Sequence, residues 1–171
     1  KNFKTCVYCT AQTLASLDET TLARDYAYLE KYVGIDKVYL ETYRDGTWVS
    51  IDHMKMIQNF FKEHGVEIAG GITTVTPPLE KDDVKRQRLF QTFCYSNEAM
   101  RTYLKKIVTY TAELFDEIIL DDFFFTSCTC DDCLRERSNL SWAEFRSKKM
   151  IDVAENLVLK PAKLARSEER R

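Results

Sequence analysis

Two adjacent acidic residues follow a short apolar segment of the chain. Residues 117–133 read EIILDDFFFTSCTCDDC, so Asp121 and Asp122 come directly after a segment that is typical of a strand buried on both faces. A buried carboxylate costs free energy unless it is paired or hydrogen-bonded, so an acid pair at this place indicates a functional site. In parallel α/β folds, ligands bind at the carboxyl ends of the strands, which is where this pair would lie.

Three cysteines follow the acid pair at the spacing C-x-C-x-x-C. They are Cys128, Cys130 and Cys133, and this spacing alone is a moderate indication of a metal site. The two acids inside the motif, Asp131 and Asp132, are interpreted as solvated loop residues.

The composition argues against several classes of protein. A formal net charge of −2 gives no electrostatic reason to expect a nucleic-acid partner, and no apolar run approaches the roughly 20 residues of a membrane span. Cys6 and Cys9 lie three apart on an expected strand and would face opposite ways, so we interpret them as two small buried side chains. The start at Lys1, almost inside a strand, fits a processed N-terminus, and we favour a periplasmic or secreted location over a cytoplasmic one.

Strand-like and helix-like segments alternate along the chain. Residues that cap helices mark the helix starts, namely Asp18, Ser50, Asn97 and Ser141, the last with Glu144 in a capping box. We expect strands at residues 5–12, 37–44, 66–75 and 117–120, and helices at 19–32, 51–64, 97–115 and 141–161.

This order of four β-α units predicts an α/β fold with parallel strands and right-handed crossovers. Four units are half of a TIM (β/α)8 barrel, which has about 250 residues. We therefore expect a (βα)4 half-barrel over residues 1–165 and a charged tail at 166–171, and we favour a fragment of a longer barrel. A small open sheet, or two copies that close one barrel, are the alternatives. The expected protein partner is thus the remainder of the barrel or a second copy.

Two motifs of the chain resemble those of bacterial glycoside-hydrolase-like TIM barrels. They are LDDFFF with the C-x-C-x-x-C that follows it, and FCYSNEAMRTYL at residues 93–104. The thiol arrangement is similar to the zinc site of family 42 β-galactosidases, where one cysteine after the third strand joins a C-x-C-x-x-C after the fourth. The resemblance covers residues 5–160 and implies a carbohydrate substrate.

The resemblance also implies that Cys94 joins Cys128, Cys130 and Cys133 as ligands of a structural zinc ion. Thiolates are soft ligands, and four of them form a closed tetrahedral site. Neighbouring βα loops lie side by side, which would bring Cys94 to the other three. A disulfide pair and free thiols are the alternatives, and no organic cofactor is expected.

The implied reaction is hydrolysis of a glycosidic bond by two carboxylates, one of them an acid and the other a nucleophile or base. Family 42 enzymes end the fourth strand with Asn-Glu, whereas this chain has Asp121-Asp122, so their reaction does not transfer. The aspartate is more similar to the nucleophile of α-glycosidase-type barrels. Neighbours on a strand face opposite ways, so Asp121 and Asp122 cannot both serve. Asp122 is slightly nearer the mouth of the barrel, so we favour it as the catalytic residue. The alternative is that both are hydrogen-bonded structural groups.

Glu41 ends the second expected strand at the same edge of the sheet. With Arg44, Trp48 and Phe124 it is expected to line a sugar subsite, although a salt bridge between Glu41 and a neighbour is the alternative. The second catalytic carboxylate of such barrels comes from a later strand, so this chain need not contain it. The alternative functions are a non-catalytic carbohydrate-binding barrel and a zinc-stabilised scaffold.

Overall fold

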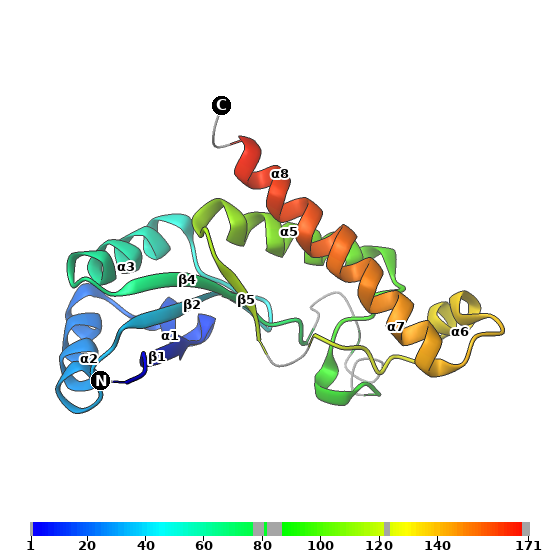
Figure 1. Cartoon of the computed structure of the whole chain (residues 1–171), viewed down its shortest axis with the longest axis horizontal. Helices are drawn as coiled ribbons and strands as arrows, with labels where there is room; N and C mark the ends of the chain where they lie inside the picture. Colours follow the sequence, from blue (N-terminus) through cyan, green and yellow to red (C-terminus); the bar gives the residue numbers. More distant parts are fainter. Residues whose placement is uncertain (1, 77–80, 82–86, 122–123, 169–171) are drawn as a thin grey trace.

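The computed structural model describes residues 2–76, 81, 87–121 and 124–168, which form an α/β fold around one sheet (Figure 1). Four parallel strands lie in the order β1-β2-β4-β5, so each pairs with the next parallel strand along the chain. A short strand, β3, pairs antiparallel with β2. The strands are β1 (Cys6–Cys9), β2 (Lys37–Arg44), β3 (Thr47–Trp48), β4 (Glu67–Ile72) and β5 (Ile118–Leu120).

Helices connect the strands and begin where the capping residues predict. Asp18, Ser50, Asn97 and Ser141 each accept a hydrogen bond from a backbone N–H of the first turn. None of the helices in the described ranges has the length and apolar character of a membrane span. The helical segments are α1 (Ala11–Ser16), α2 (Glu19–Tyr32), α3 (Ile51–Glu63), η1 (Leu89–Gln91, a 3₁₀ turn), α5 (Glu98–Leu114), α6 (Asp131–Arg137), α7 (Trp142–Asp152), η2 (Val153–Leu159, a π-helical segment) and α8 (Lys160–Glu168).

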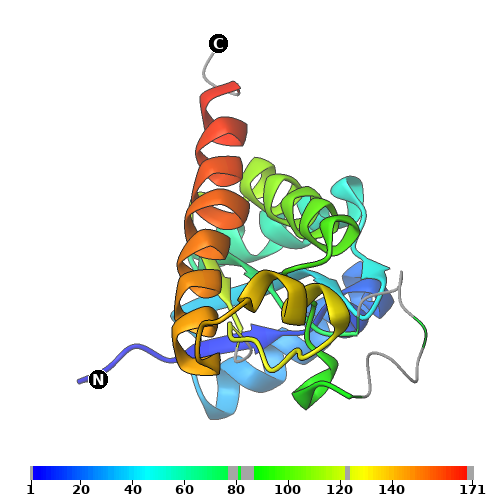
Figure 2. The ribbon, with the colours of Figure 1, turned by 90° about the vertical axis from the view of Figure 1, so that its right-hand side faces the viewer.

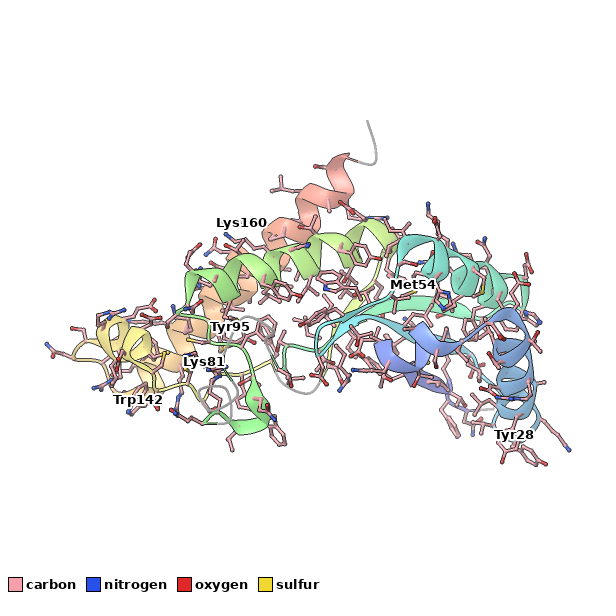
Figure 3. The ribbon with its side chains drawn as sticks, turned by 180° about the vertical axis from the view of Figure 1, so that it is seen from behind. Tyr28, Met54, Lys81, Tyr95, Trp142 and Lys160 are labelled. Carbon is pink, nitrogen blue, oxygen red and sulfur yellow. The ribbon has the colours of Figure 1, made fainter. Side chains whose placement is uncertain are left out.

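The helices pack on one face of the sheet. Val38 and Leu40 of β2 are buried in a core cluster with residues of α1, α2 and α3, such as Met54 (Figure 3). Ile72 of β4 is buried in a second cluster, which includes residues of α5 and η2. Figure 2 shows α7, η2 and α8 as one long helix that runs beside α5. The buried residues of α1, α2, α3, α5 and η2 therefore meet the same side of the strands.

The opposite face of the sheet carries Tyr8, Tyr39 and Ile119. The Tyr8 and Tyr39 rings stack at a centroid distance of 6.5 Å, and Ile119 is 37% exposed, so this face is open to solvent in the described part of the chain. Strands in sequential order with helices on one face are typical of a barrel, whereas doubly wound sheets carry helices on both faces. The α/β fold with a parallel sheet is confirmed, and it is compatible with the predicted half of a TIM barrel.

The structure corrects some of the local predictions. β5 is not buried on both faces, because Ile119 lies on the open face. The first strand is shorter than predicted, since Thr10 caps the unpredicted helix α1. Cys6 is exposed and Cys9 is only partly buried, so the interpretation of both as buried apolar side chains is wrong.

Candidate functional site

Glu41 lies at the centre of a hydrogen-bond network at the carboxyl end of β2. Its side chain is fully buried, and both carboxylate oxygens are engaged. Oε1 accepts from the Tyr8 hydroxyl at 2.8 Å and from the Thr73 hydroxyl at 2.5 Å, and Oε2 accepts from the backbone N–H of Ala11 at 2.7 Å. The Nε of Arg44 donates to Oε2 at 2.8 Å. The salt bridge that was the alternative interpretation of Glu41 is therefore present.

Arg44 connects this buried acid to Asp121, which follows β5. Its Nη2 donates to Asp121 Oδ2 at 2.9 Å and lies 2.9 Å from the Thr73 hydroxyl, which is 3.3 Å from the same Asp121 oxygen. The Asp121 side chain is 23% exposed, and its Oδ1 accepts no hydrogen bond from a described residue. The buried carboxylate of Glu41, the guanidinium of Arg44 and the partly exposed carboxylate of Asp121 thus lie in a row from the interior to the surface.

A bulge in β2 brings Glu41 and Arg44 to the same face of the sheet. Residues three apart on a regular strand face opposite ways, but the register of β2 against β4 shifts between Glu41 and Tyr43. Thr42 points to the helix side, where its hydroxyl lies 2.6 Å from that of Thr111. Because the bulge adds one residue to the strand, Arg44 returns to the side of Glu41.

Gly71 of β4 leaves room for the network on the open face of the sheet. A Cβ atom added to Gly71 would lie 2.7 Å from the Tyr8 hydroxyl oxygen, which is closer than real contacts of this kind. The hydroxyl that donates to Glu41 therefore occupies the space that a side chain at this position would take.

Burial and the charge of Glu41 alter the pKa values of the neighbouring groups. Burial first, and then this charge, raise the pKa of the Tyr8 hydroxyl well above its usual range and the pKa of Cys9 to about 11. For Arg44, burial opposes the charged form, but the hydrogen bond and charge of Glu41 outweigh it and raise its pKa. Tyr8 is therefore a neutral donor in the network, and Arg44 is a cation.

The four predicted metal-binding cysteines form one cluster, the thiol cluster (Cys94, Cys128, Cys130 and Cys133). Their Sγ atoms all lie within 4.8 Å of one another. The Sγ of Cys94 is 3.6 Å from that of Cys130 and 3.7 Å from that of Cys133, which in turn are 3.8 Å apart. A tetrahedron with zinc–sulfur bonds of about 2.3 Å has edges of about 3.8 Å, whereas a disulfide bond is about 2.05 Å long. The free thiols therefore have the spacing of a metal site.

Polar groups surround the thiol cluster. Nη1 of the buried Arg88 lies 4.0 Å from the Cys128 sulfur, and the Ser96 hydroxyl lies 3.4 Å from the Cys133 sulfur. Hydrogen bonds with the thiols of Cys133 and Cys94 lower the pKa of Cys128, and the contact with Cys128 raises the pKa of Cys94. One thiolate in the cluster is thus stabilised by its neighbours.

Helices α6 and α7 lie at the end of the molecule opposite to α2 (Figure 1). Cys133 lies on α6, and Phe145 of α7 packs against the thiols with Trp142 (Figure 3). Lys149 of α7 is buried and forms an ion pair with Glu136 of α6. The thiol cluster therefore holds α6 against the connection that follows β4, which carries Cys94. Helix α7 packs on the cluster.

Other predicted site residues lie elsewhere. Asp122, which we favoured as the catalytic residue, lies outside the described residues. Trp48 packs on the helix side of the sheet and donates its indole N–H to the Tyr103 hydroxyl at 3.1 Å, and Phe124 packs against the same core cluster. Both rings pack on the helix side, away from the described members of the Glu41 network, so their role in sugar binding stays a prediction.

Tyr8, Thr73 and Arg88 were not among the predicted site residues. Tyr8 lies in the first predicted strand and Thr73 near the end of the third, so a search of all predicted strand ends for polar side chains would have included them. Arg88 gave no such signal, because it is one of several charged residues in a long connection. Its contact with Cys128 depends on how two connections fold together.

The chain matches the family described as "Probable glycosyl hydrolase, catalytic domain" over residues 1–169, and it belongs to this family. It is also 32% identical, over 187 aligned residues, to an uncharacterized protein from Saccharolobus solfataricus. That alignment covers 95% of this chain but 31% of the relative, so the chain spans about a third of the relative's length. No solved structure matches the chain.

Proposed function

We propose that this chain forms part of the active site of a glycoside hydrolase, with Asp121 or Asp122 as a catalytic carboxylate. The observation that carries the proposal is the Asp121 carboxylate, which Arg44 holds at 2.9 Å at the carboxyl end of β5. Barrel enzymes bind substrates at this edge of the sheet. Family membership supports the general class, and the carboxylate supports the reaction type.

In this proposal Asp121 acts as an ionised carboxylate. A carboxylate that is paired with a guanidinium is suited to act as nucleophile or base, because both roles need the anion. Its Oδ2 is held by Arg44 and Thr73, so Oδ1 is the oxygen that would face the sugar. The proton donor would then be a carboxylate from a later strand, as in other barrels of this type, because adjacent residues of a strand do not serve together as acid and nucleophile.

Glu41 is proposed to position Arg44. Its side chain is fully buried, and its oxygens already accept hydrogen bonds from four neighbouring residues, so it offers no free edge to a sugar. Arg44 is 21% exposed and reaches both acids. Of the two, Arg44 is the residue that would contact substrate.

The thiol cluster is proposed to bind a structural zinc ion. Four thiolates leave no open position for substrate, and the spacing of the sulfur atoms fits tetrahedral zinc. Bound zinc would fix α6 and the connection after β4 against one another. In this role the zinc ion stabilises the structure around the site and takes no part in bond cleavage.

The test uses the natural full-length protein with Asp121→Asn and Asp122→Asn, assayed on 4-nitrophenyl glycosides of both anomers. Loss of the catalytic carboxylate should lower kcat by at least about 10³-fold in one variant. Asp45→Asn is the matched control, because Asp45 lies in an exposed turn at a positive φ that asparagine also adopts. Unchanged turnover in both variants would refute the proposal. Sugar binding without hydrolysis by the wild-type protein would favour the non-catalytic alternative.

A further inference from the structure

Helices α6 and α7 bring two arginines onto one tryptophan ring. The guanidinium carbon of Arg137 lies 4.8 Å from the centroid of the Trp142 ring, and that of Arg146 lies 5.2 Å from the same centroid. Figure 3 shows Trp142 at the end of the molecule opposite to Tyr28. The attraction between each cation and the indole keeps both guanidinium groups in place at this end of the protein.

Neither of the two arginines has an acidic partner in the described part of the chain. The Nη1 of Arg137 donates to the Leu140 carbonyl at 2.6 Å, whereas Arg146 donates to no acceptor among the described residues. Arg135 of α6 differs, because it forms an ion pair with Asp132 on the same helix. Two cations therefore share one ring without a counter-ion from the described residues.

The acids that lie nearest to these arginines in the sequence are engaged elsewhere. Glu136 forms an ion pair with the buried Lys149. Glu144 accepts hydrogen bonds from the backbone N–H and the hydroxyl of Ser141, the residue that caps α7. A counter-ion for the two arginines therefore has to come from outside α6 and α7.

Partial burial strengthens the attraction of the two guanidinium groups for an anion. The Nε atoms of Arg137 and Arg146 are buried and have no hydrogen-bond partner among the described residues. A donor that has lost water without gaining an acceptor costs free energy, and a charge that is partly removed from water attracts an anion more strongly. Both residues remain partly exposed, so an anion can approach them.

The composition of this surface is typical of a protein–protein contact. Tryptophan and arginine are enriched at the residues that dominate binding energy in such contacts. Leu134 lies three residues before Arg137 on the same face of α6 and is 45% exposed, which adds an apolar side chain. The planar guanidinium group matches a carboxylate in two parallel hydrogen bonds. The net charge of −2 argues against a nucleic acid, so the surface fits a protein segment that carries Asp or Glu.

The natural protein is expected to supply such a segment from its own polypeptide. This chain spans 31% of the length of its relative, so most of the relative lies outside the aligned part. A segment on the same polypeptide is present at a high effective concentration, so a small surface is enough to hold it.

We propose that Arg137, Trp142 and Arg146 form a docking surface for an acidic segment of the natural full-length protein outside residues 1–171. Carboxylates of this segment pair with the two guanidinium groups, and its apolar side chains pack on Leu134 and the indole. Because Trp142 also packs against the thiol cluster, the docked segment covers that end of the molecule. The inference goes beyond the proposed function, since it concerns assembly of the protein and requires no catalysis.

The test places the photo-cross-linking residue p-benzoylphenylalanine at Ala143 of the natural full-length protein. Ala143 is exposed and directly follows Trp142 on α7. Mass spectrometry of the irradiated protein should find a cross-link within one chain to an acidic segment outside residues 1–171. Arg146→Glu should lower the yield at least about tenfold, because it places a negative charge opposite the carboxylates. Sodium chloride at about 1 M should also lower the yield, because salt screens exposed charges.

Arg135→Glu is the matched control, because it makes the same charge reversal on α6 at a side chain that pairs with Asp132 and does not contact the indole. It should retain the wild-type yield. Arg146→Gln, which removes the charge without reversing it, should lower the yield while the unfolding temperature stays that of wild type, which separates loss of docking from loss of folding. A cross-link between two chains, a cross-link to a segment without acids, or no cross-link would overturn the proposal. Equal yields in Arg146→Glu and Arg135→Glu would overturn it as well, and none of these outcomes depends on turnover.

Discussion

The Glu41–Arg44–Asp121 network lies at the carboxyl ends of parallel strands, whereas the thiol cluster lies in the segments that follow β4 and β5, and different forces hold the two. The thiol cluster consists of four thiol donors, three of them within residues 128–133. The network joins unlike groups from β1, β2 and the residues after β4 and β5, and each bond has its own donor and acceptor. A bound ion would shape the cluster, whereas the backbone must shape the network. Residue spacing in a sequence therefore indicates a metal-type cluster of identical ligands much better than a hydrogen-bond network of unlike groups.

The largest effect should come from loss of one thiolate. Cys133→Ser leaves three sulfur ligands, and metal binding to a structural site contributes directly to folding. We expect loss of bound zinc and a decrease in the free energy of unfolding on the order of 5 kcal/mol. Elemental analysis and thermal unfolding of the purified protein measure both quantities.

Cys6→Ser is the control for this change, because Cys6 is an exposed thiol outside the cluster. It should retain both the zinc content and the unfolding temperature of wild type. A metal-free wild-type protein whose stability does not change in Cys133→Ser would contradict a structural zinc site.

The second largest effect should come from substitution of the buried Glu41. In Glu41→Gln the amide nitrogen would face donors on either side, because Ala11 and Arg44 can only donate to the oxygens of Glu41. We expect the free energy of unfolding to fall by about 3 kcal/mol. Chemical denaturation measures this change, with Glu67→Gln as a control, because Glu67 pairs with Lys4 at the exposed surface. Equal stability of the two variants would show that the network does not support the fold.

Removal of the shared hydroxyl should have a smaller effect. Thr73→Val keeps the shape of the side chain but removes the hydroxyl that donates to Glu41 and accepts from Arg44. A loss of about 1 to 2 kcal/mol in the free energy of unfolding is expected. Thr47→Val is the matched control, because the Thr47 hydroxyl donates to no described residue. If both substitutions have the same effect, the hydroxyl of Thr73 is not part of the network.

The smallest effect concerns a thiol beside the network. Burial and the Glu41 charge raise the pKa of Cys9 to about 11, so little thiolate is present at pH 8, and the thiolate fraction increases as the pH rises toward 11. Iodoacetamide should therefore alkylate the exposed Cys6 at least about tenfold faster than Cys9 at pH 8. Peptide mass spectrometry follows both sites. Equal rates at pH 8 would contradict the raised pKa of Cys9.

The predicted elements agree with the structure where the signal is local. The strand at Lys37–Arg44 and the helix at Glu19–Tyr32 have the predicted bounds, because side-chain periodicity and a capping residue act within a few positions. Helix α1 was missed, since its six residues are too short to show periodicity. The exposure of Ile119 was missed because it depends on what covers the open face of the sheet.

The sequence by itself determined the alternation of strands and helices and the C-x-C-x-x-C set of three thiols, because periodicity and ligand spacing are properties of neighbouring residues. Only the tertiary structure decided that Glu41 is buried and that Arg44 reaches Asp121. The reason is the bulge at Thr42, which turns Arg44 to the side of the sheet on which Glu41 lies. The guanidinium of Arg44 can therefore bind both Glu41 and Asp121, which are far apart in the sequence.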